Sequence, residues 1–269
     1  MSVLTEISSY IVWFAIYSIA GWIYETIICS ISAKKLVKRG FLNGPYCPIY
    51  GTGAVCCILL FSDINNILGL FFAGMVVTSV IEYFTSWAME KLFSARWWDY
   101  SNRKFNLNGR ICLLGSVVFG AMIVLLIKIL HPWIASITNN INPYAMIALA
   151  AVFIVGFAVD IIFTVVHMNR FNEKLGEIHL RAQQAISDYR VQAEARKEDI
   201  KNKLQVSVEA IRNKKSEVKL SLHERRILRS FPKFQSTRYS DALKSVKEDW
   251  KKYIEKKKEK INKKKDKTK

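Results

Sequence analysis

Three carboxyl side chains stand inside long apolar stretches of the sequence: Glu25, Glu82 and Asp160. An ionisable group in hydrocarbon is costly, so it usually faces the interior of a helix bundle and has a partner there. Carboxylates in that setting bind cations, relay protons or tie helices together. A functional and a purely structural role both stay open for Glu25 and Glu82, whereas packing is favoured for Asp160.

Each acid shares a helical face with small or polar residues. Such faces let membrane helices approach closely, so the three acids are expected to point inward. The residues that share the three faces are Ser18, Gly21, Cys29 and Ser32 with Glu25, then Ser79, Ser86 and Glu90 with Glu82, then Gly156, Thr164 and His167 with Asp160.

A segment rich in proline and glycine follows the first apolar stretch, at residues 38–51. It cannot form a continuous helix, and broken backbone at membrane depth is tolerated only where protein or a water-filled cavity surrounds it. Transporters often bind substrate at such segments, although a rigid turn that starts a short helix is slightly favoured over a ligand site. Its candidate site residues are Arg39, Gly44, Pro45, Cys47, Pro48 and Tyr50.

A second loop combines aromatic residues with opposite charges. Trp97, Trp98 and Tyr100 suit the headgroup region of a bilayer. Arg96, Asp99 and Arg110 can pair with one another, with Glu90 or with a lipid phosphate. Asn106 is a further candidate site residue of this loop.

The lengths of the apolar stretches predict the helices that position these residues. About 20 helical residues cross a hydrocarbon core of about 30 Å. Four stretches reach that length, and a fifth is shorter and contains Pro48, Gly51 and Gly53. The predicted spans are residues 10–31, 46–61, 67–87, 111–130 and 144–167.

Charge decides the number and the direction of the spans. The 269 residues carry a net charge of +18, yet residues 1–167 hold only ten Lys/Arg and seven Asp/Glu. If the short stretch crosses, the basic flanks alternate in the sense of the positive-inside rule. Five spans are therefore favoured, with the N-terminus outside and the C-terminus cytoplasmic.

The rest of the chain is a long basic tail. Residues 169–230 are expected to be helical, with a broken apolar stripe that includes Ile178, Ile200 and Ile211. Residues 231–269 are expected to be amphipathic and then, from Lys256, disordered. An apolar face among lysines indicates contact with anionic lipid headgroups, and no nucleic-acid partner is expected. That face contains Ala242, Val246, Trp250, Ile254 and Ile261.

The sequence indicates neither a cofactor nor a metal site. Its five cysteines lack metal-ligand spacing. No glycine-rich phosphate loop of the P-loop type is present, so the chain is not an ATPase subunit.

Several motifs that occur in order resemble the bacterial ABC-transporter type IV permease family of CmpB-like integral membrane proteins. They lie at residues 21–25, 39–51, 82–86, 96–101 and 106–110. Residues 231–240 are similar to a tail segment of longer members. The resemblance implies a transport-related protein of the bacterial plasma membrane that works with a separate ATPase.

The predicted fold class is therefore all-α: a polytopic membrane helix bundle of about five transmembrane helices with a long, helical, basic cytoplasmic tail. Transport is the leading functional hypothesis. One alternative is a membrane enzyme in which Arg39, Arg96 and Arg110 bind a phosphate-bearing or lipid-linked substrate. Its acid or base would be Glu25, Glu82 or Asp99, and its nucleophile Cys47 if the thiol is activated. A non-catalytic scaffold is the other alternative, and an enzyme is less favoured than a transporter.

Overall fold

The computed structural model describes residues 2–195 and 220–266 of the chain, and helices dominate it. The helices are α1 (Val3–Ala33), α2 (Pro48–Phe61), α3 (Ile67–Phe93), α4 (Leu113–Leu125), η1 (Leu126–Leu130), α5 (His131–Thr138), α6 (Pro143–Ala195), α8 (Leu222–Ser230) and α9 (Ser240–Asp266). Four two-residue strands form two antiparallel pairs, β1 (Ala95–Arg96) with β4 (Gln235–Ser236) and β2 (Asn106–Leu107) with β3 (Ile111–Cys112).

Four helical stretches in the described part of the chain are long and apolar enough to cross a membrane. They are Val3–Ala33, Ile67–Phe93, Leu113–Thr138 and Pro143–Asp188. The predicted fifth span corresponds to α2, which has 14 residues and reaches only about 21 Å at 1.5 Å per residue. By length alone, α2 is too short to cross a hydrocarbon core.

The helix ends follow from the local sequence. The Asn66 side chain accepts hydrogen bonds from Leu68 N and Gly69 N and so begins α3. α1 and α3 end where Lys34 and Ser94 adopt left-handed backbone conformations, at φ 49° and 47°. Pro132 lacks a backbone N–H, and the helix accommodates it through the π-helical turn η1 just before it.

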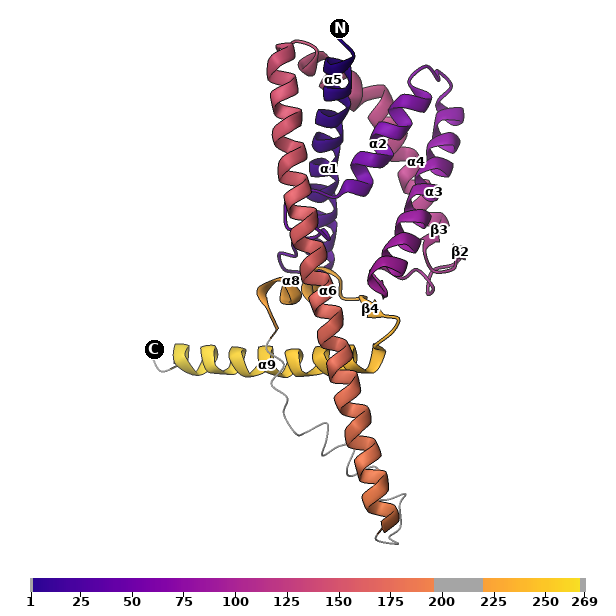
Figure 1. The fold of residues 1–269 in the computed structure, drawn as a ribbon. Helices are drawn as coiled ribbons and strands as arrows, with labels where there is room; N and C mark the ends of the chain where they lie inside the picture. Colours follow the sequence, from indigo (N-terminus) through magenta and orange to yellow (C-terminus); the bar gives the residue numbers. More distant parts are fainter. Residues whose placement is uncertain (1, 196–219, 267–269) are drawn as a thin grey trace.

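The chain runs back and forth between two ends of the bundle (Figure 1). α1 leads away from the N-terminus, and the segment after it turns back, so that α2 begins beside the middle of α1. The hydrogen bond from Cys47 N to Ser18 O, 2.8 Å long, fixes that position. α2 then rises to the end where the chain starts. As a result, the loops after α1 and after α3 both lie at the end from which α6 leaves the bundle.

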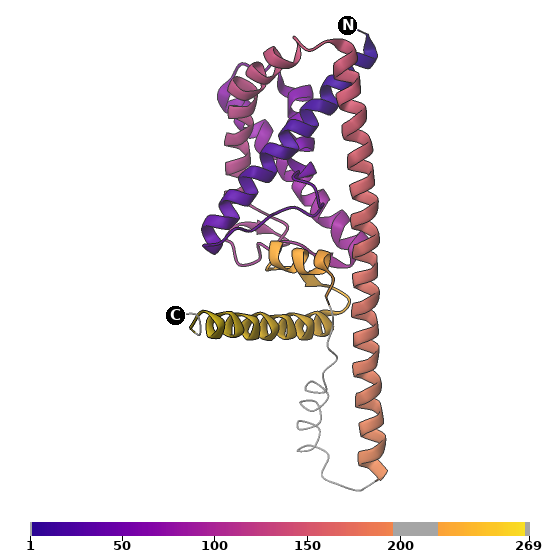
Figure 2. The same ribbon diagram turned by 90° about the vertical axis from the view of Figure 1, so that its left-hand side faces the viewer.

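Residues Leu220–Trp250, which we call the tail cap, pack against that end of the bundle. In Figure 2, α8 lies directly beneath the bundle and α9 runs crosswise to α6. An apolar core joins the cap to α3, β1 and α6. Its buried residues are Phe93, Ala95, Trp97, Met168, Phe171, Leu175, Leu220, Ile227, Leu228, Phe231, Phe234, Ala242, Leu243 and Val246.

The tail cap corrects two expectations. Trp97 does not lie in the headgroup region, because it is 3% exposed and its ring contacts Phe231 and Phe234. The apolar face of α9 does not meet a membrane at Ala242 and Val246, since both side chains are buried in the core of the cap.

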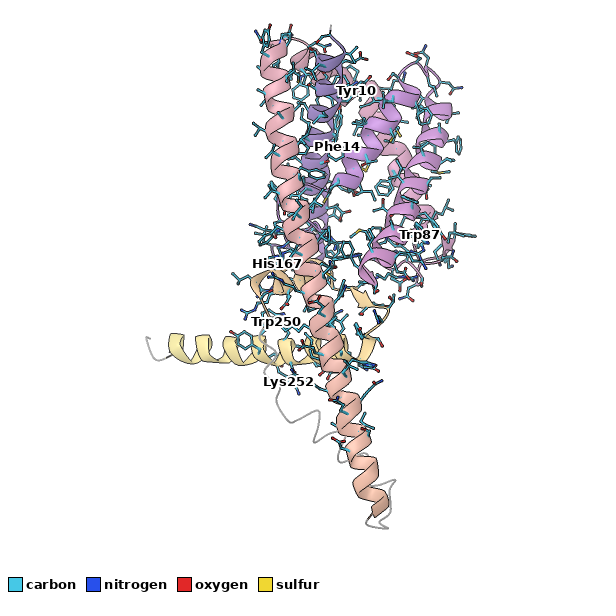
Figure 3. All side chains as sticks on the ribbon, in the orientation of Figure 1. Tyr10, Phe14, Trp87, His167, Trp250 and Lys252 are labelled. Atoms are coloured by element: carbon cyan, nitrogen blue, oxygen red, sulfur yellow. The ribbon has the colours of Figure 1, made fainter. Side chains whose placement is uncertain are left out.

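Trp250 likewise packs on protein, beneath the guanidinium groups of Arg225 and Arg229 at 5.2 and 5.3 Å from its ring. Figure 3 shows Trp250 on α9, below the point where His167 marks the exit of α6 from the bundle.

Other parts of the predicted tail compare as follows. The structure has helix through Asp266, where disorder was expected from Lys256. Helix α6 continues without a break from the membrane stretch to Ala195. Residues 196–219, including the predicted stripe at Ile200 and Ile211, lie outside the described residues.

Candidate functional site

The broken segment after α1 lies against the interior of the bundle, and protein groups satisfy its backbone. Trp22 Nε1 donates to Arg39 O at 2.9 Å. The guanidinium of Arg226, from the tail cap, donates to the carbonyl oxygens of Gly40, Phe41 and Leu42 at 2.6–3.2 Å. Irregular backbone is tolerated at membrane depth when protein surrounds it in this way.

Asp160 holds the next part of the same segment. Its Oδ1 accepts from Asn43 N and Asn43 Nδ2 at 3.1 and 3.0 Å, and its Oδ2 accepts from Gly44 N and Tyr46 Oη at 2.7 and 2.6 Å. Both carboxylate oxygens of Asp160 therefore help to fix the segment to α6. The packing role favoured for Asp160 agrees with these contacts.

Glu25 is the centre of a polar group between α1 and the broken segment. Its Oε1 accepts a hydrogen bond from Tyr50 Oη at 2.7 Å, and its Oε2 pairs with Arg39 Nε at 3.3 Å. The Cys29 thiol, one turn further along α1, donates to the same carboxylate at 3.8 Å. About 30% of the Glu25 side chain remains exposed.

Glu82 is more deeply placed. It is 5% exposed, its Oε1 accepts from Tyr100 Oη at 3.2 Å, and its Oε2 is buried without a hydrogen-bond partner in the described part of the chain. A buried carboxylate oxygen that lacks a partner carries a desolvation cost, so it favours binding a proton or a cationic group.

Tyr100 connects the two acids electrostatically. Burial raises the pKa of Tyr100, and the nearby negative charges of Glu82 and then Glu25 raise it further. Both carboxylates therefore act on one phenol, from α1 and from α3. This supports the expectation that Glu25 and Glu82 face the same interior region.

The second predicted group, in the loop after α3, forms a separate cluster of charges. Glu90 Oε2 accepts from Arg110 Nη2 at 2.9 Å and from Arg96 Nη2 at 3.4 Å. Asp99 lies 3.9 Å from Arg96 and accepts from the side chain and backbone of Ser101, hydrogen bonds that lower the pKa of Asp99. These charges neutralise one another and so hold the loop in shape.

The remaining candidates in that loop also have structural contacts. Asn106 Nδ2 donates to Arg103 O, and Asn106 Oδ1 accepts from Gly109 N. Gly109 has φ +67°, and a Cβ there would lie 2.6 Å from Asp99 Oδ1. A glycine is therefore required at this turn.

The prolines and Cys47 complete the comparison with the sequence prediction. Pro48 begins α2, where its missing N–H costs no hydrogen bond, and Pro45 is exposed in the segment that Asp160 fixes. Cys47 is buried, and no histidine of the described residues forms a hydrogen bond with its thiol.

The sequence prediction selected Glu25, Arg39, Tyr50 and Glu82, but it missed three residues that contact these acids, Asp160 or the broken segment. Tyr100 was assigned to the membrane surface, Tyr46 was not selected, and Arg226 lies more than 180 residues from the carbonyls that it binds. Of these three, only Tyr100 could have been found from the local sequence, because it lies among the aromatic residues of the second loop. In the described residues, no group of three His, Cys, Asp or Glu side chains is arranged to hold a metal ion.

Comparison with known proteins gives one match. The sequence model of the family described as "Putative ABC-transporter type IV" matches residues 12–165, which include the broken segment, both acids and the loop after α3. No curated protein and no solved structure matches the chain. The match covers more than half of the sequence and agrees with the four apolar helices. This multi-pass, transport-related membrane protein therefore belongs to the ABC-transporter type IV family.

Proposed function

We propose that this protein is the permease component of an ABC-type transport system in a bacterial plasma membrane and that a separate subunit hydrolyses ATP. The observation that carries the proposal is the arrangement of Glu25 and Glu82. Glu25 accepts a hydrogen bond from Tyr50 beside the broken, protein-lined segment, Glu82 accepts one from Tyr100, and the charges of both acids raise the pKa of Tyr100. Paired interior carboxylates next to discontinuous helix are typical of membrane transport sites.

The site has the chemistry of a cation or proton site. Glu82 Oε2 is an acceptor without a hydrogen-bond partner in the described part of the chain. Tyr50 and Tyr100 each donate a hydrogen bond from the phenol group to one of the two carboxylates. Arg39 neutralises Glu25, so the second carboxylate supplies the uncompensated charge. We propose that the transported solute, or an ion coupled to it, binds between these two acids.

The proposed orientation places the N-terminus outside and the tail cap in the cytoplasm. Both basic loops lie at the tail-cap end, as the positive-inside rule requires for a cytoplasmic face. A separate ATPase would then dock at this end. The outer rim of the loop after α3 and the surface of the tail cap are the parts of the described chain that it would meet.

Purification of the native protein from its own membranes tests the proposal. We expect an ATP-hydrolysing subunit to co-purify, and we expect the solute content of cells that lack this protein to return to normal when it is restored. Glu25→Gln and Glu82→Gln should keep the complex intact and lose the restoration. Glu177→Gln is the matched control, because Glu177 is an exposed acid on the extension of α6.

Two results together would refute the proposal. One is the absence of any ATPase in the purified complex. The other is full restoration of solute content by both interior variants, which would leave the acids a structural role only.

A further inference from the structure

An open groove of about 500 Å³ lies between the tip of the loop after α3 and the first turns of α4. One wall is apolar and belongs to a helix that is long enough to cross the membrane: Leu113, Leu114 and Val117 are 48%, 60% and 40% exposed. The rim carries Arg103 and Lys104.

The charge of the rim is one-sided. None of the residues that line the groove is acidic, and both Arg103 and Lys104 are exposed. Neither side chain has a hydrogen bond or an ion pair to another described residue, in contrast to Arg96 and Arg110, which pair with Glu90. The two cations of this loop that remain available therefore both stand at the groove.

Phe105 gives an independent indication of the surroundings. It has φ +51°, a conformation that is unfavourable for a bulky residue, and its side chain is 79% exposed beside the two cations. The bond from Leu113 N to Phe105 O, 2.9 Å long, keeps it at the mouth of the groove. A large aromatic side chain held outward beside basic residues at the end of a membrane helix suits the interface between headgroups and acyl chains.

We propose that this groove binds one anionic phospholipid. Its phosphate lies on Arg103 and Lys104, and the upper part of an acyl chain lies along Leu113, Leu114 and Val117. The apolar wall selects a lipid over a water-soluble phosphate, and the rim selects an anionic headgroup over a zwitterionic one. The inference requires only that α4 crosses the membrane, so it is independent of the proposed transport site.

Native mass spectrometry of the full-length protein in detergent, titrated with phosphatidylglycerol or phosphatidylcholine, tests the proposal. We expect one phosphatidylglycerol to bind more tightly than phosphatidylcholine. The double variant Arg103→Gln/Lys104→Gln should weaken its binding by about 30-fold, since each cation near an anionic headgroup contributes ~1 kcal/mol and ~1.4 kcal/mol is a factor of ten. The control is Lys34→Gln/Lys35→Gln, which removes two exposed cations from the same end of the bundle but away from the groove.

A second variant distinguishes lipid binding in the groove from non-specific electrostatic attraction of the lipid. Val117→Trp fills the apolar wall and keeps both cations, so it should also weaken the binding of phosphatidylglycerol. An equal loss in the Lys34/Lys35 control, unchanged binding in Val117→Trp, or equally tight binding of soluble glycerol phosphate would each overturn the proposal.

Discussion

At the scale of single residues, Asp160 shows how one carboxylate replaces regular secondary structure. It accepts hydrogen bonds from Asn43, Gly44 and Tyr46, so a segment that cannot be helical still has its donors satisfied. These contacts give an acid within an apolar helix a structural role.

Asp160→Asn should therefore destabilise the folded protein. The amide turns an N–H group towards donors that need an acceptor, and hydrogen bonds to a charged group contribute about 1.5–3 kcal/mol each. We expect a loss of about 2–3 kcal/mol in the free energy of unfolding, measured by denaturation in detergent. The exposed Asp63→Asn is the control. Equal stability of the two variants would contradict the proposed role.

We expect His223 to make the attachment of the tail cap depend on pH. Its Nδ1 lies 3.0 Å from Asn43 Oδ1, and because the Asn43 amide donates to Asp160, the hydrogen must be on the histidine. Burial, followed by the charges of Arg226 and His167, lowers the pKa of His223 to about 4, against an opposing effect of Asp160.

The docked cap thus holds His223 neutral, while a released cap would protonate it below a pKa of about 6.5. The docked state binds fewer protons, so its stability falls as the pH drops from about 6.5 towards 4, by at most about 1.4 kcal/mol per pH unit. Hydrogen exchange of α8 should be faster at pH 5 than at pH 7. His223→Asn keeps a hydrogen-bond donor for Asn43 but cannot titrate, so the difference in the exchange rate of α8 between pH 5 and pH 7 should shrink. If that difference stays the same in the variant, another group causes the pH dependence.

At the scale of elements, the contact between α1 and α2 depends on glycine. A Cβ on Gly51 would lie 2.2 Å from Ser18 Oγ and 2.5 Å from the backbone oxygen of Phe14. The close approach places Tyr50 against α1, where its hydroxyl reaches Glu25. The same close packing through small residues is common between membrane helices.

Gly51→Ala should push α2 away from α1 and lower the stability by about 1–3 kcal/mol. Gly156→Ala provides the matched control, because no atom lies within 4 Å of a Cβ at that position on α6. Thermal denaturation of both variants in detergent measures the difference. If the two melting temperatures change equally, the contact is not tight.

The sequence was sufficient for the four long membrane helices, because their length and apolar composition follow directly from the thickness of the bilayer, but it did not show that the fifth predicted span would be a helix of only 14 residues. It was also sufficient for the inward direction of Glu25 and Glu82, since the cost of exposing a carboxylate to lipid leaves few alternatives. The tail cap was not predictable in this way. Its core combines Trp97 with Phe231 and Phe234, residues more than 130 positions apart, and no local periodicity reports such a contact.

At the scale of the whole molecule, the path of the chain predicts which surfaces share a compartment. The loops after α1 and α3 lie at the tail-cap end, and the turn between α5 and α6 lies at the opposite end. With the proposed orientation, a membrane-impermeant maleimide should therefore label cysteines placed at Lys35 and Lys104 from the cytoplasmic side and a cysteine at Asn140 from the outside. The five native cysteines are buried or half-buried, so they give little background.

Labelling of Lys35→Cys and Lys104→Cys from opposite sides would contradict this path. It would mean that α2 and the broken segment return to the side from which they came. The two loops would then have different partners, and the electrostatic link between Glu25 and Glu82 through Tyr100 would not survive in the membrane.

Helix α6 runs as one rod of 53 residues, about 80 Å long, from the apolar bundle past the tail cap. No proline interrupts it after Pro143. If such a rod tilted rigidly by about 10° about its membrane end, its distant tip would move by about 14 Å. Because Asp160 holds the broken segment on the same helix, a displacement of that segment that tilted α6 would move the distant tip further than the segment itself.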